Sequence, residues 1–253
     1  MDLTKKKVID KVLVINNPDK EDVFGIIGRM EIILEYFKAN PKHKNLVPFL
    51  ETYYLITKAV AEKQLDHPGF FKNPSLLKKL DVHFAGLYFE PLKVYLETGK
   101  SARPWKCYFD YCERLDDGMP FLQMFLGINA HINGDLCTSL KSVRYKERGD
   151  YLAVNTILHE KIPEIMKFLA FVEHDYYVMA GYLYKKLIEE EFQKVVVGWR
   201  LNAWTNAEFK LSRKHVMKTE RVGESLVKIF EKTSFLKNWR TMATDVNCLE
   251  VKL

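Results

Sequence analysis

The sequence is poor in cysteine and lacks the patterns in which cysteine organises a fold. It has four cysteines among 253 residues, at Cys107, Cys112, Cys137 and Cys248. They form no C-x-x-C pair and have no histidines at zinc-finger spacing. This argues against a disulfide framework and against a zinc–thiolate site. We expect the thiols to be reduced and buried.

Long apolar runs and strong charge are also missing. No stretch reaches the roughly 18 uncharged apolar residues of a membrane span. Asp10 and Lys11 interrupt the apolar residues near the start, so we expect no signal peptide and a cytoplasmic location. The net charge is only +6, without the basic run or motif typical of a nucleic-acid-binding protein. We expect no membrane span and no nucleic-acid partner, and the oligomeric state stays open.

Helical periodicity is what the chain has in abundance. Apolar residues recur at steps of three and four along most of its length, and 47% of all residues are hydrophobic. There is no internal repeat, low-complexity linker or shift in composition. The sequence therefore predicts a single compact all-α domain over residues 1–253, with about eight to ten helices around a buried central helix.

Caps, prolines and glycines set the expected boundaries. We expect Asn17, before Pro18, to cap a helix that ends near Ala39. Pro91 and Pro163 should bend or interrupt their helices. Residues 244–253 are expected to form a short extended tail. The other helices are predicted at about 46–65, 73–97, 104–115, 120–142, from 150 (with Asp150 as N-cap), 174–195, 198–219 and 223–232.

The predicted central helix carries polar residues where a core helix would have apolar ones. Its segment Gly127–Leu136 reads GINAHINGDL. Gly127 and Gly134 share one side of an α-helical wheel, where a neighbouring chain segment can approach closely. Buried polar groups are costly unless they are paired. The fold must therefore satisfy the two asparagines, the histidine and the aspartate of this segment.

Those four residues form two pairs on different sides of the wheel. His131 and Asp135 are four residues apart, as are Asn129 and Asn133. An aspartate beside an imidazole fixes its tautomer and suits a general base, and the same pair can bind a divalent metal. The alternative is a buried structural network. For the two asparagines, hydrogen bonds across a helix interface are the simpler interpretation.

A second candidate group lies on two later helices. Arg200 and Trp204 share a helix face, where the guanidinium can stack on the indole and reach a carboxylate, either Asp135 or Asp150. Should Arg200 hold Asp135, the His131 pair becomes mainly structural. Should it face an open pocket, it becomes an anion-binding group. Asn155, on the helix after Asp150, is a further candidate for orienting a ligand.

Together these residues resemble the uncharacterised bacterial proteins grouped as domain-of-unknown-function family 5995. The resemblance covers about residues 47–211, and its most specific part is the block Asn129–Asn133. It implies a helical fold and marks individual positions, but it names no reaction. The further matching positions are Tyr54, Thr57, Val60, Phe84, Ala85, Tyr88, Trp105, Phe109, Leu126, Gly127, Asp135, Leu136, Asp150, Asn155, Ile157, Leu158, Arg200, Ala203, Trp204 and Ala207.

Two functions from different classes follow as hypotheses. The first is a hydrolase of an ester or phosphoester, in which His131 is the base or a metal ligand, Asp135 its partner and Arg200 an anion anchor. Residues 131–135 are similar to the His-x-x-Gly-Asp segment of zinc-dependent phospholipase C and related single-strand nucleases, without the proline and second histidine that follow there. The second is a non-enzymatic scaffold or small-ligand-binding protein. Candidate ligand-binding residues are Asn129, Asn133, Asp150, Asn155 and Trp204.

Overall fold

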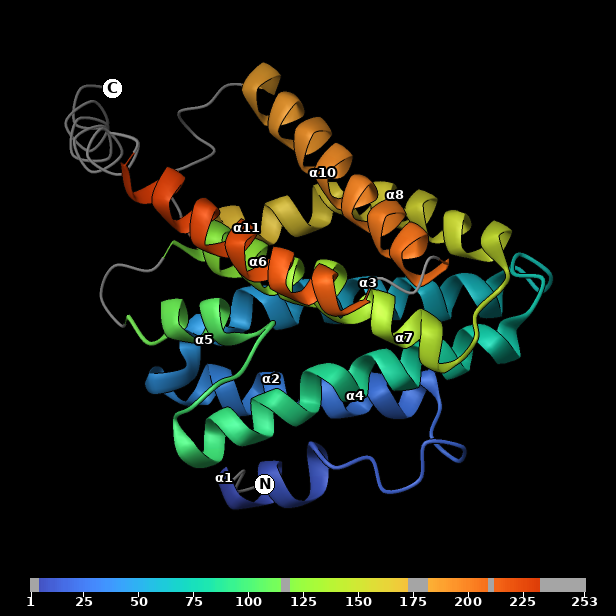
Figure 1. Cartoon of the computed structure of the whole chain (residues 1–253), viewed down its shortest axis with the longest axis horizontal. Coiled ribbons are helices and arrows are strands. Elements are labelled where there is room, and N and C mark those ends of the chain that lie inside the picture. The colour runs from blue at the N-terminus through green and yellow to red at the C-terminus, as the bar shows by residue number, and fades with distance from the viewer. Residues whose placement is uncertain (1–4, 115–118, 173–181, 209–211, 233–253) are drawn as a thin grey trace, which may run out of the picture.

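The protein is built of helices, and the computed structural model describes residues 5–114, 119–172, 182–208 and 212–232. No strand occurs in these ranges, so the predicted all-α class is confirmed. None of the helices there is long and apolar enough to cross a membrane. In Figure 1 the run from α6 to α7 lies between α2 and α4 on one side and α8 and α10 on the other. The elements are α1 (Lys5–Lys7), η1 (Val8–Val12), α2 (Val23–Ala39), η2 (Pro41–Leu46), α3 (Val47–Asp66), α4 (Pro74–Thr98), α5 (Lys106–Cys112), α6 (Pro120–Ile128), η3 (Asn129–Asp135), α7 (Leu136–Ser142), α8 (Arg148–Val172), α10 (Tyr182–Glu208) and α11 (Ser212–Lys232).

Several helix ends follow the local chemistry of the sequence. Asn73 caps α4 by accepting a hydrogen bond from the Leu76 amide at 3.0 Å, and Gly99 closes the same helix with φ at 68°. The first long helix begins later than predicted. Asp22, and not Asn17, is the N-cap of α2, because its carboxylate accepts from the Gly25 amide at 2.8 Å. Asn17 instead accepts from the amide of Lys20 in the preceding turn.

Some expected interruptions do not occur. α4 runs through Pro91 and α8 runs through Pro163. Buried residues on both sides of each proline, such as Phe89 and Leu92 in α4, hold the helix together by packing. The sequence also predicts breaks between about 195 and 198 and between about 219 and 223. Both predictions are wrong, because α10 continues through Gly198 and α11 continues through Gly223. The predicted start at about 174 and the tail at 244–253 lie outside the described residues.

The central segment is buried nearly all round, as predicted, but it is not one α-helix. Its middle part, η3, is a π-helix between α6 and α7. A π-helix bonds each amide to the carbonyl five residues earlier, so its turn is wider than that of an α-helix. Such turns are often found at functional sites. Here the wider turn spans Asn129 to Asp135, the residues that carry the polar groups.

Two glycines explain how the central segment fits its neighbours. A Cβ atom on Gly127 would lie 2.3 Å from the Phe49 ring, and one on Gly134 would lie 2.5 Å from Pro104 Cγ. Neither distance is sterically possible without movement of the neighbour. The close approach predicted from the small side of the wheel is therefore confirmed at both positions.

We expect Gly127→Ala to destabilise the protein by about 1–3 kcal/mol, because the added methyl group collides with a ring buried in the core. Urea unfolding monitored by circular dichroism measures this change. Gly28→Ala in α2 is the matched control, since its Cβ would meet nothing within 4 Å. It should stabilise the helix by about 0.5–1 kcal/mol. Equal stability of the two variants would contradict the packing described here.

Candidate functional site

An aromatic cage encloses the imidazole of His131. The ring stacks on Phe84 of α4, with centroids 3.5 Å apart and planes 8° apart. The ring of Tyr53 from α3 meets it edge-on at 4.4 Å. Trp105 and Phe49 approach it at 5.8 Å. The side chain is only 4% exposed. Burial lowers the pKa of His131 well below its usual 6.5, so the imidazole is neutral at physiological pH.

Asp135 pairs with His131 as the spacing predicts. Its Oδ2 atom lies 3.4 Å from His131 Nδ1 and accepts a hydrogen bond from Trp105 Nε1 at 2.9 Å. Burial raises the pKa of Asp135 well above 3.8, and the bond from Trp105 works against this shift. The low dielectric around the pair disfavours charge on either member. Two forms of the pair keep the imidazole neutral: a protonated Asp135 beside an imidazole with its N–H at Nε2, and, after loss of one proton, an ionised Asp135 beside an imidazole with its N–H at Nδ1.

The other nitrogen of His131, Nε2, is buried and has no hydrogen-bond partner among the described residues. An unpaired polar atom in such a place is costly. When Asp135 is ionised and the imidazole N–H is at Nδ1, Nε2 presents a lone pair, and when Asp135 is protonated, Nε2 carries the N–H group. Either form offers one polar contact to a bound molecule.

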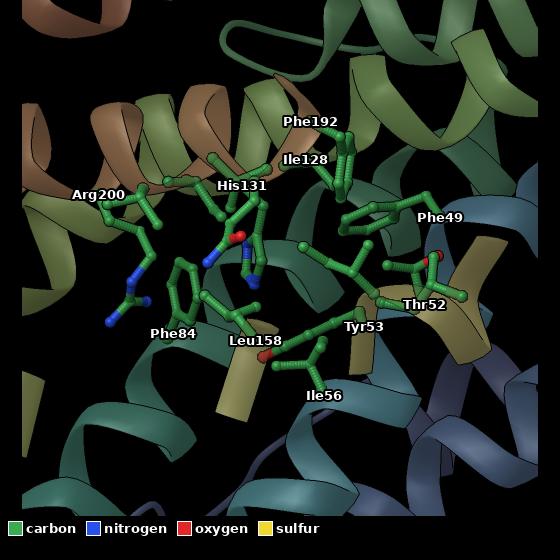
Figure 2. Close-up of a pocket in the computed structure, with 16 residues that line it drawn as sticks. Phe49, Thr52, Tyr53, Ile56, Phe84, Ile128, His131, Leu158, Phe192 and Arg200 are labelled. Carbon is green, nitrogen blue, oxygen red and sulfur yellow. The ribbon is translucent and has the colours of Figure 1, made fainter. Parts of the chain in front are cut away.

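His131 lies in the wall of a pocket of about 90 Å³. Figure 2 shows His131 near its middle, Arg200 toward one end, and Phe49 and Phe192 toward the other. The walls come from α3, α4, α6, η3, α8 and α10, and apolar side chains dominate them. The lining residues are Phe49, Thr52, Tyr53, Ile56, Phe84, Ile128, His131, Ile132, Leu158, Ile162, Ile165, Phe192, Gln193, Val196, Val197 and Arg200.

Arg200 is at the pocket but does not bind either carboxylate proposed for it. Its Nε donates to Asn155 Oδ1 at 2.7 Å, and a terminal nitrogen donates to the Tyr151 carbonyl at 2.8 Å. The guanidinium stacks on the Tyr151 ring at 4.4 Å, and not on Trp204. The carboxyl of Asp135 thus interacts with Trp105 and His131 and not with Arg200. Of the two arrangements considered from the sequence, the structure has the one in which Arg200 lines a pocket.

The other candidate residues have structural partners. Asn129 donates to the Thr219 carbonyl of α11 at 3.0 Å and accepts from Asn133 at 3.0 Å. Asn129 therefore bonds across a helix interface, as the simpler interpretation held, whereas Asn133 bonds to Asn129 within η3. Asp150 is not the N-cap of α8, which begins at Arg148. Its carboxylate oxygens instead accept from the amides of Lys72 and Asn73, each at 2.8 Å, and so fasten the start of α4 to α8.

Trp204 and Asn155 stand beside the pocket rather than in its wall. The Trp204 indole donates to Glu208 Oε1 at 2.7 Å and packs against Tyr151. Asn155 acts by holding Arg200. Sequence reasoning missed the cage residues Tyr53 and Phe84 as parts of a site, because aromatic residues at helical spacing look like ordinary core. It also gave Trp105 no role, although that position matches the resembled family.

The donor set at His131 and Asp135 is small for a metal. Within the described ranges, no group of three or more His, Cys, Asp and Glu side chains is placed to hold a metal ion. Protein metal sites of zinc use three or four such ligands, and Asp135 Oδ2 is already bonded to Trp105. The metal-free form of the hypothesis fits these residues better than the metal-dependent form.

We expect Asp135→Ala to cost about 1–3 kcal/mol, because it leaves the Trp105 indole N–H and His131 Nδ1 without a partner. Thermal and urea unfolding measure this change. Asp110→Ala is the control, since Asp110 pairs with Lys106 on the surface and such pairs contribute at most about 1 kcal/mol. If the Asp135→Ala protein were as stable as the parent, the buried carboxyl would contribute no net stability, as is common for groups in active sites.

A family model matches most of the chain, residues 23–234, which extends beyond the region of resemblance at both ends. It includes the central segment, the cage of His131 and Arg200. No curated protein and no solved structure matches the chain. The chain belongs to the family of unknown function DUF5995.

Proposed function

We propose that the protein binds a small, mainly apolar molecule in the pocket at His131. The unpartnered Nε2 atom in an otherwise apolar wall is the observation that carries this proposal. Ligand sites are commonly apolar clefts with a few directed polar groups. A molecule that bonds Nε2 and fills the pocket would supply the missing hydrogen bond and cover the exposed apolar walls.

Metal-free hydrolysis of a carboxylic ester is the second candidate, and the His131–Asp135 contact favours it. In this reaction His131 Nε2 takes a proton from water, the oxygen of that water adds to the ester carbonyl, and the C–O bond to the alcohol breaks. The imidazolium then returns its proton to the departing alcohol, so that protons balance. Asp135 keeps the ring oriented, and Arg200 serves as an anion anchor. The apolar walls suit a carboxylic ester better than a phosphoester, which carries more charge.

Filling the pocket tests the binding proposal. Val197→Phe replaces a lining side chain with a larger one. Neutral aliphatic amides of four to six carbons should raise the melting temperature of the parent protein but not that of this variant. Leu201→Phe lies one helical turn further along α10, on an exposed position outside the pocket, and should bind as the parent does. His131→Phe keeps a ring against Phe84 but removes Nε2, so it should weaken binding by about fivefold or more. Equal binding by all three variants would contradict the proposal.

The hydrolase candidate is tested with 4-nitrophenyl esters of short aliphatic acids. His131→Phe should lower kcat/KM by about 100-fold or more if His131 is the general base. A base must be unprotonated to act, and burial lowers the pKa of His131 well below 6.5. The rate should therefore not fall through protonation of the imidazole itself near pH 6.5; it should fall as Asp135, whose pKa burial raises, takes up a proton and Nε2 comes to carry the N–H. Hydrolysis that is unaffected in His131→Phe would rule out this reaction and leave the binding proposal intact.

A further inference from the structure

Arg200 is a buried cation without an anionic partner in the described part of the chain. Its side chain is 7% exposed. It bonds only the neutral oxygens of Asn155 and Tyr151 and forms no ion pair with a described Asp or Glu. A guanidinium has five N–H donors, so the remaining donors are free for a ligand. A buried charge without a counter-ion is strongly unfavourable, and a bound anion would remove that cost.

Asp81 of α4 does not line the pocket, but its carboxyl is close enough for the charge of Arg200 to act on it. It precedes Phe84 by three residues, so the two share a face of α4. The positive charge of Arg200 acts on Asp81, but burial dominates and raises the pKa of Asp81 to about 7. Asp81 forms no hydrogen bond or ion pair with a described residue. Arg200 and Asp81 therefore interact electrostatically without direct contact.

A third polar group near them is also unsatisfied. The hydroxyl of Tyr145 is buried without a hydrogen bond in the described structure. Asp81 and Arg200 both act on Tyr145 electrostatically, and Asp81 acts on Tyr53 as well. Three incompletely satisfied side chains thus come from α4, α10 and the segment between α7 and α8. A packed structural network would have paired them with one another.

We propose, on the basis of the binding function above, that the ligand is a small aliphatic carboxylic acid whose carboxylate binds Arg200, and that Asp81 sets its affinity by competing for the same positive charge. A planar carboxylate matches two N–H groups of a guanidinium. The apolar end of the ligand would lie among the aliphatic and aromatic walls. The pocket of about 90 Å³ is small, so the aliphatic chain of the ligand should be short.

The charged groups around Asp81 determine how pH changes the affinity for this ligand. The positive charge of Arg200 from α10 favours the ionised form of Asp81, whereas the negative charge of a bound carboxylate disfavours it. Binding of the ligand therefore raises the pKa of Asp81, and its carboxyl takes up a proton. Burial raises the pKa of Tyr53 and Tyr145, which keeps both phenols neutral. On η3, His131 is neutral and Asp135 is bonded to Trp105. Burial also lowers the pKa of His83, which contacts Ser139 of α7. Affinity for the anion should therefore rise as the pH falls through about 7.

Calorimetry of the full chain with 4-methylpentanoate and its neutral amide, 4-methylpentanamide, tests this inference. At pH 6 the acid should bind about tenfold or more tightly than the amide, and it should bind more weakly at pH 8. The acid itself stays ionised at both pH values. Asp81→Asn should raise the affinity at pH 8 to the value at pH 6 and remove the pH dependence. Arg200→Gln should remove the preference for the acid, whereas Asp110→Asn, on the surface, should change nothing.

The outcomes separate this inference from the function on which it rests. If the amide binds as tightly as the acid, or if Asp81→Asn keeps the pH dependence, the carboxylate site is wrong and the pocket still binds apolar molecules. If the acid binds Arg200→Gln or Val197→Phe as it binds the parent, it occupies another place and the inference is overturned. If neither compound binds, both proposals fail. Circular dichroism and the melting temperature of Arg200→Gln show whether that variant has kept its fold.

Discussion

The neutral, caged imidazole of His131 is the constraint around which the protein is arranged. Three helical elements and the residue before α5 supply its surroundings: Tyr53 on α3, Phe84 on α4, Asp135 on η3, and Trp105. The ring is held on its faces by aromatic contacts and at Nδ1 by Asp135, which leaves only Nε2 uncommitted. Because burial keeps the ring uncharged, the pocket can be apolar and still offer a polar contact.

The π-helical segment η3 carries both polar pairs of the central segment. Residues four apart lie on the same side of a helix, so His131 meets Asp135 and Asn133 meets Asn129 within it. One pair then faces the aromatic cage, and the other faces α11 through the Thr219 carbonyl. The seven residues of η3 therefore both contribute to the site and pack against a neighbouring helix.

The sequence predicts the helical class, the burial of the central segment and the His131–Asp135 pair, because periodicity and spacing are local properties. It does not predict the π-helix, since a widened turn depends on packing from several directions. It also mistakes Gly223 for a helix start. The structure shows that this glycine lies inside α11, where a Cβ would come within 3.1 Å of Cys107 and 3.3 Å of Asn129. The role of Asp81 could not be read from the sequence either, because its significance comes from Arg200, more than a hundred positions away.

The hydrogen bond from Trp105 to Asp135 gives the protein a built-in spectroscopic reporter. The indole N–H donates a hydrogen bond to the carboxyl of Asp135, which also contacts His131 Nδ1, so its NMR resonance will shift when that carboxyl gains or loses a proton. The signal comes from a residue that does not line the pocket. The ionisation of Asp135, and with it the tautomer of the imidazole, can therefore be followed in the resting protein and during occupancy, independently of any assay of turnover.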